Sequence, residues 1–384
     1  EVLGFVMRKC RVIGSRLDKR LAGYVGRSMS ILGCGYSRSC LYHSSRIEAG
    51  IDGMNDWQIG LQEVIDENVA KSLYRNGYAV VANAVSSDFC KLLRTEIEVL
   101  HSNEALYPNK THFVNTSTGT TSYLQKKSIF ETDGHNPELL ESSKNDIPLL
   151  LISKFERDPS LSTLLSLYEP KFSLKRQTIK AQLTKSNGGC FPIHTDSDEL
   201  VDERKVTAIL YLNQEWMPKD GGQLVLYPFP NDTVTIEPRE GTLALFSSCH
   251  MLHRTLPYTA SEKTRYCITQ WLSGDVKSNA VEFDALSSNA EDSWRRLFTK
   301  SLRGHLTKLM LCEEWIESII ASHNESEDRK FVVNTLNSEV EQIFHKIKVS
   351  FPEFTHDCHS ALELRQKITT EIPQIRQSQT TLWF

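Results

Sequence analysis

The sequence predicts an α+β fold in which a double-sheet β-barrel of the jelly-roll type is flanked by helical segments. Helical periodicity dominates before residue 172 and after residue 274. Short apolar runs punctuated by Gly, Pro, Asn and Asp fill the stretch between them, which is typical of closely spaced strands. The chain has 384 residues, enough for one large domain with appendages or for two domains.

Composition and periodicity divide the chain into four segments. Residues 1–47 carry nine Lys and Arg side chains against two acidic ones, so we expect a disordered or targeting segment. Residues 48–171 are expected to form an N-terminal helical region that supports the barrel. Residues 172–274 are expected to form the jelly-roll core, and residues 275–384 a helical C-terminal extension.

Before the barrel, helical periodicity alternates with shorter apolar and polar stretches. Ser86, Ser87 and Asp88 form a plausible helix cap, because short polar side chains accept hydrogen bonds from the first free amides of a helix. The expected elements are a helix over 57–77, a short buried strand over 78–83, a helix over 89–101, exposed loops or a short hairpin over 103–145, and a helix over 149–169.

Within and after the barrel, the pattern changes from strands to helices. Val, Ile, Thr, Tyr and Phe are frequent in the strand-like runs, as expected for β-structure. Expected strands cover 176–184, 205–213, 223–228, 233–237, 242–246 and 264–272, and expected helices lie near 290–302, 305–322, 326–348 and 358–370.

The overall charge and the cysteines restrict the class of protein. A net charge of −4 argues against general nucleic-acid affinity, which usually needs a strongly basic face. No stretch approaches the roughly 20 apolar residues of a membrane-spanning helix, so we expect no membrane span. The nine cysteines are odd in number and form no CxxC pair, which favours reduced thiols. We therefore expect an intracellular protein, cytoplasmic or organellar.

The stretch His194-Thr195-Asp196 is a candidate metal site. On a strand, residues i and i+2 point to the same face, so one imidazole and one carboxylate would converge. Two histidines and one carboxylate on one face make the facial triad of non-haem Fe(II) oxygenases. His253 is the expected third ligand, because it lies in a strand-like stretch and its separation from His194 leaves room for four strands.

Four other side chains compete for these positions. His250 is the alternative to His253, but its Ser-Ser-Cys-His context is loop-like. Asp198 is the alternative to Asp196, and on a regular strand it lies about 7 Å farther away, so we expect it to face solvent or the rim. Cys190 and Cys249 are better interpreted as small buried residues than as soft ligands.

Arg265 opens the last expected strand of the barrel and is a candidate anion anchor. A bound dicarboxylate needs a fixed cation at its far end, and the planar guanidinium pairs with both oxygens of a carboxylate. Thr269 lies four residues further on the same strand face and offers a hydroxyl to the same carboxylate.

The run from His194 to Trp271 resembles the Fe(II)/2-oxoglutarate-dependent oxygenase superfamily, and most closely its prolyl 4-hydroxylase-like branch. The family pattern is HxD, a distant His, and Arg or Lys roughly ten residues later. Here it stands as His194-x-Asp196, His253 and Arg265, with Tyr-Leu-Asn (211–213) and Gly-Gly-x-Leu (221–224) segments between them. The resemblance implies a double-stranded β-helix (jelly-roll) oxygenase core.

The same resemblance implies the cofactors and further site residues. Iron, Fe(2+), would be held by the triad, 2-oxoglutarate would be the co-substrate, and L-ascorbate would act as reductant. Tyr211 would hydrogen-bond the distal carboxylate of 2-oxoglutarate beside Arg265, and Leu224 would line its pocket. The branch often has a tyrosine ten residues before the first histidine, where this chain has Thr184, and this departure bears on the substrate pocket.

The implied function is hydroxylation of a substrate C–H bond with O2, giving succinate and CO2. A protein prolyl residue is the leading substrate. The alternatives are a small-molecule or non-prolyl hydroxylase on the same scaffold, because a fold does not choose a substrate, and a catalytically inactive binding module. The complete set of His194, Asp196, His253 and Arg265 argues against the inactive module.

Overall fold

A computed structural model describes residues 10–11, 57–114, 121–134, 150–198, 202–277, 300–378 and 383–384. The expectations for residues 1–47 lie outside the described residues, except at two positions that form a short strand. The helix expected near 290–302 lies almost wholly outside them as well, since description resumes only at residue 300.

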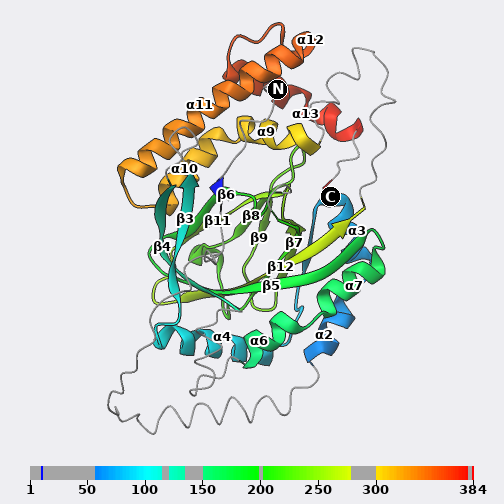
Figure 1. The fold of residues 1–384 in the computed structure, drawn as a ribbon, viewed down its shortest axis with the longest axis vertical. Coiled ribbons are helices and arrows are strands. Elements are labelled where there is room, and N and C mark those ends of the chain that lie inside the picture. The colour runs from blue at the N-terminus through cyan, green and yellow to red at the C-terminus, as the bar shows by residue number, and fades with distance from the viewer. Residues whose placement is uncertain are drawn as a thin grey trace, which may run out of the picture.

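Two antiparallel sheets form the centre of the molecule (Figure 1). Their strands in chain order are β1 (Cys10–Arg11), β2 (Tyr78–Val81), β3 (Tyr107–Val114), β4 (Thr121–Asp133), β5 (Phe172–Lys185), β6 (Gly189–His194), β7 (Arg204–Tyr211), β8 (Leu224–Tyr227), β9 (Val234–Ile236), β10 (Leu243–Ser247), β11 (Leu252–Tyr258) and β12 (Thr264–Val276). The larger sheet has eight strands in the order β1-β3-β4-β5-β12-β7-β10-β2, and the smaller has four in the order β6-β11-β8-β9.

The strands from β5 to β12 pass back and forth between the two sheets. β5, β7, β10 and β12 belong to the larger sheet, and β6, β8, β9 and β11 to the smaller one. The strands predicted between residues 172 and 274 are confirmed by this arrangement. Four strands separate β6 from β11, as the spacing between the two histidines predicted.

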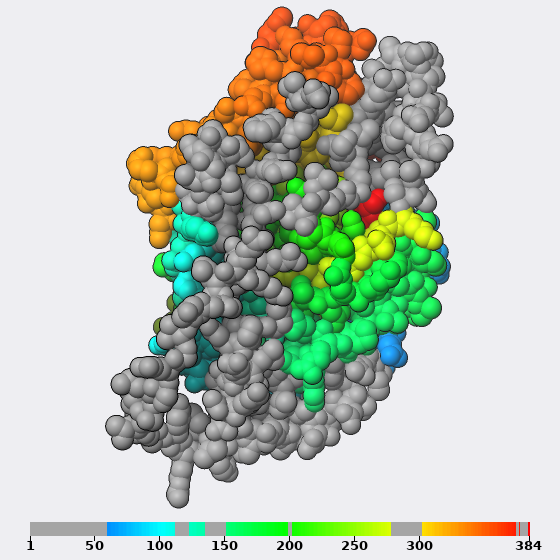
Figure 2. All heavy atoms as spheres, in the orientation of Figure 1, coloured from blue at the N-terminus to red at the C-terminus, as the bar shows by residue number. Residues whose placement is uncertain are grey.

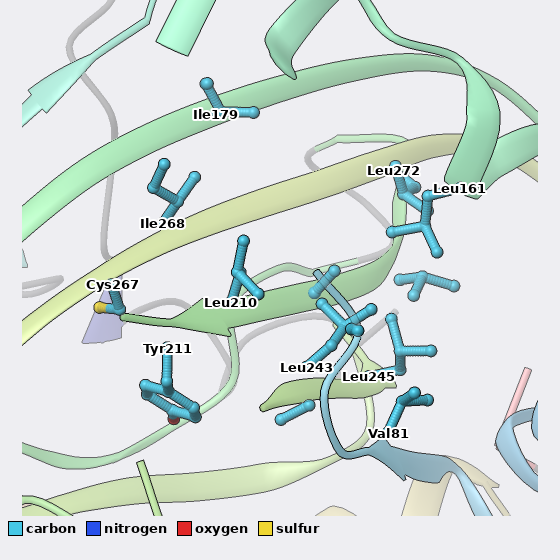
Figure 3. Close-up of a cluster of buried hydrophobic side chains, with 14 of the residues drawn as sticks. Val81, Leu161, Ile179, Leu210, Tyr211, Leu243, Leu245, Cys267, Ile268 and Leu272 are labelled. Carbon is cyan, nitrogen blue, oxygen red and sulfur yellow. The ribbon is translucent and has the colours of Figure 1, made fainter. Parts of the chain in front are cut away.

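The N-terminal helices pack on the outer face of the larger sheet (Figure 1). The side chains of Asp66 and Ser86 cap two of them by accepting hydrogen bonds from Val69 N and Phe89 N. Figure 3 shows Leu210 and Tyr211 on opposite sides of β7, so one side faces these helices and the other faces the smaller sheet. The helices are α2 (Trp57–Val64), α3 (Glu67–Asn76), α4 (Ser87–Ser102), α6 (Leu150–Arg157) and α7 (Ser160–Tyr168).

Of the two alternatives predicted for 103–145, the described part shows a hairpin, but a longer and more buried one than predicted. β3 and β4 form a long hairpin that extends the larger sheet beyond β5. Its polar side chains suggested exposure, yet Asn109, Lys126 and Glu131 are buried. Glu131 accepts hydrogen bonds from Asn109 and from Lys180 of β5, so the polar groups satisfy one another inside the fold.

The C-terminal helices pack against the smaller sheet, and Figure 2 shows them in gold and orange at one end of the molecule. Ile193 and Leu252 of that sheet pack with Trp315 and Ile319. The hydroxyl of Ser318 accepts a hydrogen bond from the amide of Ile193 at 3.0 Å, so it occupies a donor at the open edge of β6. These helices are α9 (Lys300–Met310), α10 (Cys312–Ser322), α11 (Glu327–Ser350), α12 (Pro352–Thr355) and α13 (Ala361–Ser378).

In the part of the chain that the structure describes, no helix has the length and apolar character needed to cross a bilayer.

Trp383 and Phe384 return to the N-terminal layer and fill a site beside α3. Phe384 stacks on Tyr74 with ring centroids 6.1 Å apart, and it meets Phe172 edge-on at 5.1 Å. Gly77 has a φ of 78°, and a Cβ at this position would lie 2.3 Å from the Trp383 ring. The indole therefore occupies the space that a side chain at residue 77 would need.

We expect Trp383→Ala to lower the free energy of unfolding by about 3–5 kcal/mol, because it empties a fully buried site. Urea denaturation monitored by circular dichroism measures this change. Phe331→Ala is a matched control, since Phe331 is 47% exposed on α11. An equal, small loss in both variants would contradict the packing role of Trp383.

The buried His323 predicts a pH dependence of stability. Its Nε2 lies 3.0 Å from the Thr111 hydroxyl and its Nδ1 lies 3.1 Å from the carbonyl of Ile319, which suits the neutral ring. Burial, together with the nearby Lys126, lowers the pKa of His323 to about 4. A histidine whose pKa is lower in the folded state than in the unfolded state favours folding fully above pH 6.5, the unfolded-state pKa. This contribution to stability is lost as the pH falls towards the folded-state pKa.

Between about pH 6.5 and 4, His323 is therefore expected to cost the folded state about 3 kcal/mol. Unfolding of His323→Gln should depend less steeply on pH over this range than unfolding of the parent protein. His356→Gln, at an exposed position, is the control and should keep the parent slope. If the free energy of unfolding changed equally with pH in all three proteins, His323 would not be the source of the pH dependence.

Candidate active site

Two neighbouring strands of the smaller sheet bring two histidines together. His194 is the last residue of β6, and His253 of β11 is its partner in the sheet register. Asp196 lies just beyond the end of β6, where its amide donates to the carbonyl of Ser248 at 3.0 Å. One side-chain donor atom from each of these three residues lies within 4.8 Å of the other two. The structure thus brings together the three predicted ligands.

Backbone contacts fix the orientation of both imidazoles. Nδ1 of His194 lies 2.8 Å from the carbonyl oxygen of Pro192, and Nδ1 of His253 lies 3.1 Å from that of Met251. Each Nδ1 therefore carries the hydrogen and donates it, which leaves Nε2 with a free lone pair. The two Nε2 atoms lie 3.4 Å and 3.6 Å from the same oxygen, Oδ1 of Asp196.

The other oxygen of Asp196 is already engaged. Oδ2 accepts hydrogen bonds from the Thr207 hydroxyl at 2.7 Å and from the Trp271 indole at 3.1 Å. Oδ1 therefore remains on the side of the two imidazoles. Burial alone raises the pKa of this carboxyl, but the two histidines and these hydrogen bonds outweigh it and hold the pKa below its ordinary value.

Both kinds of donor are therefore in the protonation state that a metal requires. Asp196 is a carboxylate, and burial together with the neighbouring His194 lowers the pKa of His253 to about 4, so this imidazole is neutral at pH 7. Two imidazole nitrogens and one carboxylate oxygen on one side of a point fit a divalent iron site with open positions opposite.

A buried arginine lies at the start of β12. Arg265 is 2% exposed, and its Nε donates to the carbonyl of Gly222 at 3.0 Å. Gly222 has a φ of 75°, and a Cβ there would lie 2.8 Å from the arginine Cδ. A side chain at Gly222, the second glycine of the Gly-Gly-x-Leu segment, would therefore collide with the Arg265 side chain. The spacing of these residues in the sequence did not reveal this requirement.

Tyr211 lies beside this arginine and has a buried hydroxyl with no hydrogen-bond partner among the described residues. The guanidinium carbon of Arg265 is 5.1 Å from the centre of its ring. Burial raises the pKa of Tyr211, so the hydroxyl is neutral and can donate a hydrogen bond. A buried donor without a partner is costly, and a ligand carboxylate held by Arg265 would satisfy it.

Leu224 and Thr269 are the two remaining residues that were predicted to line the 2-oxoglutarate pocket. Leu224 of β8 is fully buried in the same apolar cluster as Tyr211. Thr269 shares the inner face of β12 with Arg265 and stands opposite Ile209 of β7 in the register. Both therefore lie in the layer between the sheets, which is the face that strand alternation predicted for Thr269.

The competing residues lie elsewhere. Asp198 is exposed, and His250, Cys190 and Cys249 are not part of the group of three converging side chains. Arg254, the residue after His253, is largely buried. Its side chain is 14% exposed and its guanidinium lies 3.3 Å from the carboxylate of Glu314 on α10. The C-terminal helices cover it, and sequence alone did not predict that contact.

Thr184, where the resemblance leads one to expect tyrosine, lies directly across from Arg265 on β5. Gly189 of β6 approaches it so closely that a Cβ on the glycine would lie 2.5 Å from the threonine methyl group. A small side chain at residue 184 is thus matched to a close approach of β6.

Thr207 and Trp271, which hold Asp196, were not among the predicted site residues. Both could be found from strand alternation, since Thr207 shares a face with Tyr211, and Trp271 shares one with Thr269.

These side chains form a candidate site for one metal ion, and the buried Arg265 is a candidate anchor for an anion. Residues 181–273 match the family model of the 2OG-Fe(II) oxygenase superfamily, and this stretch contains all three converging side chains and Arg265. The similarity to that superfamily covers residues 181–273, and the proteins similar to this chain include prolyl hydroxylases.

The chain is similar to three proteins that are prolyl hydroxylases. A hypoxia-inducible factor prolyl hydroxylase of Caenorhabditis elegans is 28% identical over 219 residues, which is 54% of this chain and only 28% of that protein. A prolyl 4-hydroxylase structure from Phytophthora capsici has a TM-score of 0.60 and 26% identity, covering 82% of this chain and 95% of that one. A Trichoplax adhaerens prolyl hydroxylase structure has a TM-score of 0.42 and 22% identity, covering 54% and 88%.

Proposed function

We propose that this chain is an Fe(II)- and 2-oxoglutarate-dependent dioxygenase that hydroxylates a substrate C–H bond with O2, giving succinate and CO2. The geometry around Asp196 carries the proposal, because one carboxylate oxygen faces two lone-pair nitrogens while the other is held by two hydrogen bonds. The passage of β5 to β12 between two sheets supports a double-stranded β-helix, or jelly roll, as the core.

The residue roles follow from this arrangement. His194, Asp196 and His253 would hold Fe(II), with both imidazoles fixed through their Nδ1 atoms. Bound iron supplies the activation of O2 and the transfer of an oxygen atom to the substrate carbon. The Arg265 guanidinium and the Tyr211 hydroxyl would bind the distal carboxylate of 2-oxoglutarate, with Thr269 beside them and Leu224 as an apolar wall.

A protein prolyl residue is the substrate we propose first. The C. elegans relative is a prolyl hydroxylase, and so is the P. capsici protein that matches most of this chain. The second candidate is a small molecule or a non-prolyl residue, which Thr184 and its close contact with Gly189 favour because they change the wall opposite Arg265. The inactive binding module is disfavoured by the complete set of metal and anion residues.

The proposal extends to the reductant and the compartment. We propose L-ascorbate as the reductant that restores oxidised iron, on the resemblance to the superfamily. Six cysteines in the described part of the chain are free, which supports a reducing compartment such as the cytoplasm or an organelle with reduced thiols. They are Cys90, Cys190, Cys249, Cys267, Cys312 and Cys358.

The deciding experiment measures succinate formed from 2-oxoglutarate when the anaerobically iron-loaded protein is exposed to O2. It is run with and without prolyl peptides, beside His194→Ala and an Asp198→Ala control at an exposed position. Turnover in the parent and the control, and its loss in His194→Ala, supports the oxygenase. Failure of the parent protein to bind iron would overturn it. Stimulation by prolyl peptides, but not by matched alanyl peptides, separates the two substrate proposals.

A further inference from the structure

A second set of polar side chains lies on the inner face of the larger sheet, away from the metal ligands. In the strand register, Cys267 and Thr269 of β12 stand opposite Gln182 and Lys180 of β5. Gln182 in turn stands opposite Glu131 of β4. Residues directly opposite in antiparallel strands share a face, so this row continues from Arg265 across the sheet.

Hydrogen bonds connect the row from end to end. Arg265 donates to the Cys267 sulfur at 3.6 Å, and that thiol lies 3.5 Å from Oε1 of Gln182. The Gln182 amide donates to Glu131 at 3.1 Å, and Lys180 donates to the other oxygen of Glu131 at 2.7 Å. The anion anchor is therefore joined to the Glu131–Lys180 ion pair through two intermediate side chains.

Lys180 of this ion pair also lies near Trp271, one of the residues that hold Asp196. The Lys180 ammonium lies 5.8 Å from the centre of the Trp271 ring, and the Trp271 indole donates to Oδ2 of Asp196 at 3.1 Å. Arg204 also lies against this ring, with its guanidinium carbon 4.3 Å from the ring centre. Two cations therefore lie near the Trp271 ring while its indole nitrogen donates to the carboxylate.

Burial of the Glu131–Lys180 ion pair costs free energy, because both charged groups lose their contact with water. Lys180 and Glu131 are each 4% exposed, and an isolated charge at such depth is strongly unfavourable. Burial alone raises the pKa of Glu131, but Lys180, Lys126 and the hydrogen bonds outweigh it, so its pKa lies below the ordinary value. Both partners are charged, and an apolar pair of similar volume would often stabilise the fold as well or better.

We propose that Glu131 and Lys180 are positioning residues that jointly orient the 2-oxoglutarate anchor Arg265 and, through Trp271, the metal ligand Asp196. This inference rests on the proposed function, because it assigns these residues a task toward the same two ligands. Glu131 acts on Arg265 through Gln182 and Cys267, and Lys180 acts on Asp196 through the indole.

The test measures binding rather than turnover. Manganese(II) replaces iron so that no reaction occurs, and calorimetry gives the dissociation constants of the metal and then of 2-oxoglutarate. We expect Glu131→Gln to weaken 2-oxoglutarate binding, and Lys180→Met to weaken the binding of both manganese and 2-oxoglutarate. Each effect should be roughly 10- to 100-fold, the usual result of removing a group that orients a ligand-binding residue. Lys180→Arg, which keeps the charge, should recover most of the lost affinity.

A matched control separates positioning from loss of stability. Arg94 and Glu240 form another largely buried ion pair, between α4 and the turn before β10, outside the row. Arg94→Met should lower the melting temperature but leave both dissociation constants unchanged. The apolar double variant Glu131→Leu/Lys180→Met removes both charges of the pair together, so the net charge of this layer is unchanged. It is expected to fold and still to bind 2-oxoglutarate weakly.

The outcomes distinguish the two proposals. Parent-like binding of manganese and 2-oxoglutarate by the double variant would overturn the positioning role and leave the oxygenase proposal standing. Failure of the parent protein itself to bind either ligand would overturn the oxygenase proposal. Weak binding in the double variant, with unchanged binding in Arg94→Met, supports the positioning role.

Discussion

Asp196→Ala should weaken divalent metal binding by more than about 100-fold. Removing a group that only orients a ligand typically costs roughly 10- to 100-fold, and Asp196 is proposed to bind the metal itself. Its loss would leave two imidazoles with no anionic partner between them. Anaerobic calorimetry with Fe(II), or with Mn(II) in its place, measures the change.

Asp198→Ala is the matched control for this variant. Asp198 is two residues away and exposed, so the sequence alone made it an alternative ligand. The control should bind metal as the parent does. The reverse pattern, with metal lost in Asp198→Ala and kept in Asp196→Ala, would mean that the converging group is not the metal site.

Arg265→Ala should weaken 2-oxoglutarate binding by about 2–5 kcal/mol, or roughly 30- to 5,000-fold, because it removes one partner of a buried charge pair. Metal affinity should stay within a few-fold of the parent, since Arg265 is not among the converging ligands. Titration of 2-oxoglutarate into the manganese-loaded protein measures the effect. Arg265→Lys should recover only part of the affinity, because an ammonium cannot form the two-pronged contact.

Lys263→Ala is the control for the arginine. Lys263 lies two residues before Arg265, but its side chain is 40% exposed and pairs with Asp220 at 3.0 Å. This variant should bind 2-oxoglutarate as the parent does. Equal affinity in Arg265→Ala and in the parent would show that the oxoacid is anchored elsewhere.

The sequence was most informative where the periodicity of a strand decided the answer. The run from β5 to β12 was predicted almost strand by strand, because its apolar stretches are short and bounded by turn residues. The convergence of His194 with His253 also followed, since four strands separate β6 from β11. Both predictions needed only local patterns and the ordering of strands.

The predictions failed where polar residues that are far apart in the sequence form hydrogen bonds with one another. Asn109, Lys126 and Glu131 look like surface residues in the sequence. Nothing local reveals that Asn109 bonds to both Lys126 and Glu131, or that Lys180 and Gln182 donate to Glu131 in the fold. The contact between Arg254 and Glu314 escaped prediction for the same reason. Partners of this kind are set by tertiary structure, and a single sequence carries no periodic signal for them.

The hydroxyl of Ser318 on the edge of β6 has a consequence for synthesis on the ribosome. β6 is the outermost strand of the smaller sheet, and its cover comes from α10, more than a hundred residues later in the chain. A nascent chain that has completed β12 still exposes this edge, and exposed strand edges promote aggregation. We therefore expect the oxygenase strands to depend on chaperones, or to fold late, until the helix has emerged.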